Sequence, residues 1–99
     1  MADLLSDAEL TAGLDAVPAW TGTTASIERT VTAPTFMAAI GIVGEVALEA
    51  ERLNHHPDID IRWRRVRFAL STHDAGGVTS LDLSLAARID SIAAAASAT

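Results

Sequence analysis

Residues 34–70, PTFMAAIGIVGEVALEAERLNHHPDIDIRWRRVRFAL, decide the fold, because one long helix pattern in them gives way to two strand patterns. Apolar residues recur every three or four positions in the first half, which is typical of an amphipathic helix. Pro34 suits the first turn of a helix, where its missing N–H would have no partner anyway. We therefore predict a helix over residues 34–53, and we expect its buried stripe to hold Phe36, Ile40, Val43, Ala47, Ala50 and Leu53.

The second half of this stretch indicates two strands with a tight connection. Apolar residues stand at odd positions from residue 59 to 63 and at even positions from residue 66 to 70. A single flat strand would place these two sets on opposite faces, so the chain must turn between them. We predict the turn at Arg64 and Arg65, which lacks the Gly or Asn usual in a hairpin turn.

The flanking segments supply two more helices and two more strands. The capping-box spacing of residues 6–9 opens a short helix that ends near residue 15, and a similar spacing at residues 79–82 opens the last helix. Residues 20–24 and 26–32 read as a hairpin. The order α-β-β-α-β-β-α predicts an α+β fold, in which a four-stranded antiparallel sheet has three helices packed on one face. No repeat or linker divides the chain, so we expect residues 1–99 to form a single domain.

Composition and charge exclude several classes of protein. The 99 residues are 49% hydrophobic, with seven basic and thirteen acidic side chains and a formal net charge of −6, which argues against direct nucleic-acid binding. The absence of Cys excludes a disulfide scaffold and a thiol nucleophile. No apolar run approaches the roughly 18 residues of a membrane span, and the acidic N-terminus does not resemble a targeting signal. We expect a soluble, cytoplasmic protein with no membrane partner.

The chain contains three histidines, and each follows a predicted helix or strand: His55, His56 and His73. Histidine is the side chain best suited to exchange protons near neutral pH, so a convergent set would favour acid/base chemistry. The alternative is that each is a surface or loop-capping residue. A metal site is less favoured, because adjacent histidines rarely point at one ion. Ser71 near His73 lacks the strand-turn-helix elbow of a serine nucleophile.

Other polar and aromatic residues near the histidines have two interpretations each. Glu51 lies four residues before His55, so a continued helix would bring the two together, or Glu51 is simply solvated. Trp63 is more often a core or interface residue than a platform for a ligand. A solvated strand face, edge protection or a surface for an anionic partner would each explain the basic cluster of Arg62, Arg64, Arg65 and Arg67.

These residues resemble the motif of the pterin-4a-carbinolamine dehydratase family. The matching positions are Glu51-x3-His55-His56-Pro57, Trp63, Ser71-Thr72-His73-Asp74 and Asp82. The resemblance covers nearly the whole chain, includes the long helix, and is weakest over residues 1–35. The chain departs from the family at Asn54 and Asp74, where animal enzymes carry Asp and Glu, and at Ile59, where the family has an aromatic residue.

The resemblance implies a lyase that removes water from 4a-hydroxytetrahydropterin and gives quinonoid dihydropterin, as in tetrahydrobiopterin recycling. It implies no metal and no organic cofactor, a small-molecule pterin substrate, and a homodimer or homotetramer. It makes His55, His56 and His73 the acid/base set. It places Asn54, Pro57, Ser71, Thr72 and Asp74 against the pterin, with support from Glu51, Trp63 and Asp82.

A second hypothesis keeps the scaffold without the chemistry. Dehydratase-like proteins serve as a transcription-factor dimerisation partner and as Rubisco assembly factors, and a fold does not by itself imply a function. The arginine cluster and Ile59 motivate this alternative. Retention of all three histidines favours the enzyme.

Overall fold

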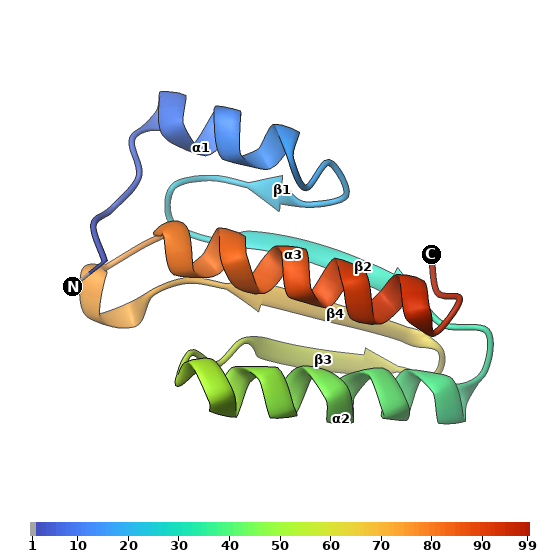
Figure 1. Ribbon diagram of the computed structural model, residues 1–99. Helices are drawn as coiled ribbons and strands as arrows, with labels where there is room; N and C mark the ends of the chain where they lie inside the picture. The colour runs from blue at the N-terminus through green and yellow to red at the C-terminus, as the bar shows by residue number, and fades with distance from the viewer. Residues whose placement is uncertain (1) are drawn as a thin grey trace.

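The computed structural model describes residues 2–99 and shows a four-stranded antiparallel sheet with three helices (Figure 1). The sheet order is β1-β2-β4-β3. A 3-10 turn, η1 (His73–Ala75), follows the last strand. The predicted α+β class and element order are confirmed by α1 (Asp7–Asp15), β1 (Thr21–Gly22), β2 (Ile27–Thr32), α2 (Phe36–Leu53), β3 (Asp58–Arg62), β4 (Arg65–Leu70) and α3 (Ser80–Ala95).

The apolar residues of the strands share one face, and the helices lie over it (Figure 1). In the register of β2 and β4, Val31 stands opposite Val66 and Ile27 opposite Leu70, so alternate side chains point into one core. These four residues belong to the same buried cluster as side chains of α2 and α3. The opposite face of the sheet carries no helix, and its side chains are mostly polar (Figure 1).

Both predicted capping boxes form. The Ser6 side chain accepts from the backbone N–H of Glu9 and the Glu9 side chain accepts in return, which begins α1. These bonds to Ser6 hold the pKa of Glu9 below its ordinary value. Thr79 and Asp82 make the equivalent pair at the start of α3. Among residues 2–99, no helix combines the length and apolar composition that crossing a membrane requires.

The buried stripe of α2 differs from the predicted one. Its buried side chains are Ala39, Ile42, Val46 and Ala50. Phe36 and Ile40, which we expected inside, are exposed together with Met37 and Leu48. The helix is apolar on two sides, and periodicity does not tell which of two apolar stripes faces the sheet. The helix also begins at Phe36 rather than Pro34, because Thr35 caps it by accepting from the N–H of Ala38 at 3.0 Å.

The turn between β3 and β4 comprises Trp63 and Arg64, one residue earlier than predicted. Trp63 has a φ of 52°, the left-handed conformation that Gly or Asn usually supplies in such a turn. This is why the local sequence gave no turn signal. The turn pairs Ile61 with Val66, which brings the two apolar sets onto one face as expected.

Candidate active site

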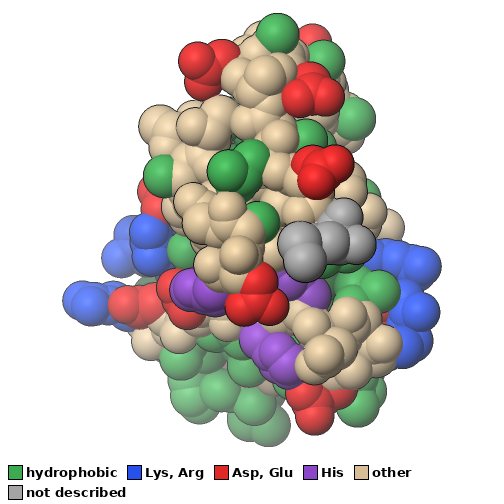
Figure 2. All heavy atoms as spheres, turned by 90° about the vertical axis from the view of Figure 1, so that its left-hand side faces the viewer, with side chains coloured by type: hydrophobic (Ala, Val, Ile, Leu, Met, Phe, Trp, Pro, Cys, Tyr) green, Lys and Arg blue, Asp and Glu red, His purple; other side chains and the backbone are tan. Residues whose placement is uncertain are grey.

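The three histidines come together at one end of the sheet, around a pocket of about 320 Å³. Two chain segments line it, residues 54–58 and residues 71–74. Figure 2 looks onto this end of the molecule, where the histidine side chains lie close to one another with acidic side chains among them. The structure therefore brings together every residue that the sequence assigned to acid/base chemistry or to pterin contact.

The end of α2 determines where His55 and His56 point. Asn54 adopts the left-handed conformation, with φ 49° and ψ 43°, and the backbone N–H of His55 donates to the carbonyl of Ala50 at 3.0 Å. This C-terminal capping geometry reverses the chain direction sharply. As a result His55 is buried whereas His56 is exposed, although the two are adjacent in sequence.

His55 is held by a buried carboxylate. Its Nε2 lies 2.6 Å from Oδ1 of Asp82, whose side chain is fully buried at the start of α3. The second oxygen of Asp82 accepts from the Thr72 hydroxyl and from the backbone N–H of Thr79, both at 2.9 Å. The hydroxyls of Thr72 and Thr79 are 2.7 Å apart. This network connects both segments of the pocket to α3 and fixes the orientation of the His55 ring.

Glu51 pairs with His56 and not with His55, the partner that a continued helix would have given it. Nε2 of His56 lies 2.5 Å from Oε2 of Glu51, and both side chains are exposed. The helix stops at Leu53, so the i,i+4 relation between Glu51 and His55 is not realised. The reversal at Asn54 turns His55 inward and brings His56 beside Glu51.

His73 lies on η1, directly after the chain leaves the last strand. The backbone N–H of Thr72 donates to Gly77 at 2.8 Å, and the Ser71 hydroxyl donates to the carbonyl of Ala25 at 3.0 Å. These bonds close the loop that carries His73 and Asp74. His73 is exposed, and its ring makes no hydrogen bond to the part of the chain that the structure describes. Its nitrogens are therefore open to a bound molecule.

The structure does not place Trp63 beside the histidines of its own chain, and its expected support of the site stays a prediction. Its side chain is 70% exposed at the β3–β4 turn, where it lines a separate pocket with Thr32, Arg64 and Arg65. Strand β3 is extended, so it carries the chain about 3.3 Å per residue away from Pro57. Ile59 also stays outside the histidine pocket.

Two residues that sequence reasoning missed belong to the site. Asp58, the first residue of β3, lines the histidine pocket. Thr79 supports Asp82 in two ways. Its backbone N–H donates to the Asp82 carboxylate, and its hydroxyl contacts the Thr72 hydroxyl, which also donates to Asp82. Its place at the head of a capping box was the available signal, since a capping residue and its partner carboxylate are adjacent in space.

The histidine pocket lacks a metal-binding arrangement. Within residues 2–99, no group of three or more His, Asp or Glu side chains is arranged to hold an ion. His55 and His56 each face a different carboxylate, Asp82 and Glu51. The geometry fits proton transfer by histidines. Carboxylates orient His55 and His56, and His56 and His73 are accessible to solvent.

Comparison with known proteins assigns the chain to a family. The family model described as pterin 4 alpha carbinolamine dehydratase matches residues 3–92. A protein of Nocardia farcinica, provisionally named pterin-4-alpha-carbinolamine dehydratase, is 54% identical over 91 residues, which is 92% of this chain and 96% of that one. A protein of Roseiflexus castenholzii with the same provisional name is 52% identical and covers 93% of this chain and 99% of its own.

Solved structures agree with this assignment. A Brucella melitensis protein described as a transcriptional coactivator/pterin dehydratase superposes with a TM-score of 0.89 at 33% identity, over 92% of this chain and 99% of that one. A pterin dehydratase-like protein identified as a RuBisCO assembly factor shares the fold, with a TM-score of 0.62 at 19% identity over 75% of this chain and 86% of that one. The chain belongs to the pterin 4 alpha carbinolamine dehydratase family.

Proposed function

We propose that this protein catalyses the dehydration of 4a-hydroxytetrahydropterin to quinonoid dihydropterin and water. The observation that carries the proposal is the convergence of His55, His56 and His73 on one pocket in a chain of this family. The pocket volume of about 320 Å³ lies in the range of small-molecule sites. The elimination needs one group to take a proton from the ring nitrogen and another to protonate the departing hydroxyl.

The pair of His55 and Asp82 is suited to the role of base. In the proposed resting state Nε2 of His55 donates its proton to Asp82 across the 2.6 Å contact, and Nδ1 is the nitrogen that accepts a proton. When Nδ1 takes a proton, the imidazolium that forms stays beside the negative charge of Asp82. A buried, hydrogen-bonded carboxylate stabilises that charge without reorganising, which lowers the barrier.

His56 and His73 are suited to the opposite role. Both are exposed at the pocket, so either can exchange its proton with solvent after each turnover. Glu51 orients His56, while His73 is not bonded within the described chain and can donate directly to a leaving hydroxyl. We place Asn54, Pro57, Ser71 and Asp74 in contact with the pterin ring because they line the same pocket.

The test is a rate measurement on the substrate itself. Freshly formed 4a-hydroxytetrahydropterin loses water spontaneously, and its absorbance change gives the rate with and without protein. The proposal predicts a rate that rises in proportion to protein concentration and saturates with substrate. A dehydration rate equal to the spontaneous rate at every protein concentration would contradict it.

We further propose that the protein forms a homo-oligomer through the exposed side of α2. Met37 is 73% and Leu48 is 67% exposed, and Ile40 lies between them along the helix. Gly41 and Gly44 are on the same side, with no atom within 4 Å of the position that a Cβ would occupy. An apolar stripe with bare backbone lets a second helix approach closely, and such stripes mark interaction sites.

Leu48→Glu is expected to lower the molar mass in light scattering to that of the monomer, because it buries a charge in the proposed interface. Ala12→Glu, which adds the same charge at an exposed position of α1, is the matched control and should leave the mass unchanged. A monomeric wild-type protein, or an unchanged mass for Leu48→Glu, would count against this interface.

A further inference from the structure

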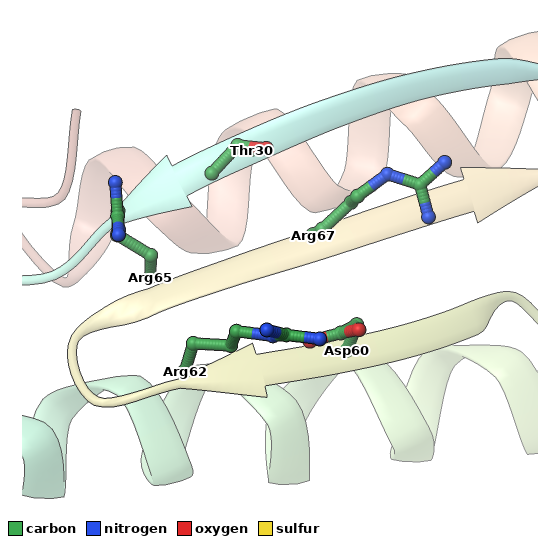
Figure 3. A pocket seen from close by; sticks show the side chains of 5 residues that line it. All are labelled: Thr30, Asp60, Arg62, Arg65 and Arg67. Atoms are coloured by element: carbon green, nitrogen blue, oxygen red, sulfur yellow. The ribbon is translucent and has the colours of Figure 1, made fainter.

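The face of the sheet that the helices leave uncovered carries a basic surface. Figure 3 shows its side chains projecting from β2, β3 and β4, with the helices behind the sheet. They line an open pocket of about 290 Å³. We define the basic sheet face as the residues that line this pocket: Thr30, Asp60, Arg62, Arg65 and Arg67.

The positive charge of the molecule is concentrated here. The chain has seven basic residues, all of them arginine, in a protein with a net charge of −6. Three of the seven lie on the basic sheet face, and Arg64 lies at the turn beside it. Two of these arginines are neutralised locally: Nε of Arg62 lies 3.2 Å from Asp60, and Arg67 pairs with Glu28. Within residues 2–99 Arg65 has no ion-pair partner. Its guanidinium is available to an external carboxylate.

An exposed tryptophan extends the basic sheet face at the β3–β4 turn. Trp63 is 70% exposed, and the Arg64 guanidinium lies 4.5 Å from the centre of its ring. Arg64 also donates to the carbonyl of Ala33 at 3.3 Å, which fixes the stack. A second pocket of about 250 Å³, lined in part by Trp63, shares Arg65 with the first. The two pockets therefore adjoin at Arg65.

We propose that the basic sheet face and Trp63 dock an extended acidic segment of a partner protein. Tryptophan and arginine are the residues that dominate binding energy at protein interfaces. Arg65 and Arg67 point the same way from β4 and stand about 6.7 Å apart, which matches alternate side chains of an extended partner segment. Charge complementarity selects glutamate or aspartate at those positions.

A nucleic acid fits this surface less well than an acidic peptide. Asp60 and Glu28 lie among the arginines, and Asp58 precedes Asp60 on β3, so a continuous phosphate backbone would meet carboxylates as well as arginines. Nucleic-acid binding depends on arginine and lysine side chains that neutralise successive phosphates. A partner with a few spaced carboxylates and one apolar side chain for Trp63 avoids that repulsion.

Docking here is separate from the proposed chemistry. The basic sheet face shares no residue with the histidine pocket, and Trp63 lies at the other end of β3. Loss of docking would therefore leave dehydration unchanged, and loss of dehydration would leave docking unchanged.

The test uses a ten-residue peptide in which glutamate alternates with threonine around one central leucine, and its glutamine counterpart. Peptide titrations are followed by backbone amide and indole N–H signals of the full-length protein. We expect the glutamate peptide to move signals of residues 62–67 and the Trp63 indole. The indole of Trp20, which is buried and donates to Asp90 at 2.8 Å, should stay in place and serves as an internal reference.

Arg65→Glu is expected to weaken peptide binding at least tenfold. Arg88→Glu makes the same change of charge at an exposed position of α3 and should change affinity less than twofold. Equal binding of the glutamine peptide, no binding in the millimolar range, or equal affinity for Arg65→Glu and Arg88→Glu would overturn the proposal. Tighter binding of a single-stranded DNA oligonucleotide than of the glutamate peptide would also overturn it.

Discussion

Replacing His73 by alanine is expected to lower the dehydration rate by about 10² while leaving the fold intact. His73 lies at the pocket, and its ring is free of hydrogen bonds to the described chain, so its removal takes away a proton donor and little else. Surface substitutions of this kind usually change the free energy of unfolding by less than about 0.5 kcal/mol. Steady-state kinetics and urea unfolding of the same preparation measure both quantities.

The control for this variant is Ser91→Ala, at an exposed position of α3 outside the pocket. It should retain the wild-type rate. A His73→Ala protein that keeps the wild-type rate would remove His73 from the proposed acid/base set. A variant that is both inactive and unfolded would show instead that the η1 turn depends on this side chain.

Asp82→Asn is expected to lower both stability and activity. The carboxylate is fully buried and faces the N–H of Thr79, the Thr72 hydroxyl and the His55 ring, three groups that can all donate. The asparagine amide keeps one oxygen that accepts hydrogen bonds. Its NH₂ group replaces the second oxygen and faces at least one of these three groups, donor against donor. Breaking a buried charged network in this way costs about 3 kcal/mol. We expect the catalysed rate to fall by more than tenfold as well, because His55 loses its orientation.

Urea unfolding and the dehydration rate, measured below the unfolding transition, separate the two effects. Asp74→Asn makes the same chemical change at an exposed position of η1, and its unfolding free energy should stay near that of the wild type. Stability equal to that of Asp74→Asn would show that the network around Asp82 contributes little to the fold. An unchanged rate in folded Asp82→Asn would remove the positioning role.

The meeting of the histidines could be predicted because it follows from the hairpin. Strands β3 and β4 are antiparallel, and Asp58 pairs with Ala69, so the residues before β3 and those after β4 must lie at one end of the sheet. The two apolar sets in residues 59–70 indicate that hairpin from sequence alone. Its turn was displaced by one residue without consequence for the site.

Other features depend on the three-dimensional structure and left no usable local signal. The second apolar side of α2 is as regular as the buried one, and only packing against the sheet selects between them. The partners of Glu51 and His55 depend on one residue, Asn54, in the left-handed conformation. Trp63 adopts a positive φ that its residue type disfavours, so the local sequence does not indicate the turn. Because Trp63 lies in this turn, at the far end of β3, it is remote from the histidines.

The most direct test of the proposed chemistry compares the dehydration of 4a-hydroxytetrahydropterin in three samples: buffer, wild-type protein, and a His56→Ala/His73→Ala double variant. Both substituted side chains are exposed, so the double variant should fold. We predict that the wild-type protein accelerates the reaction well above the spontaneous rate. The catalysed rate of the double variant should be lower than that of the wild type by a factor of about 10² or more. Equal rates for the wild type and buffer, or for the wild type and the double variant, would contradict histidine catalysis in this protein.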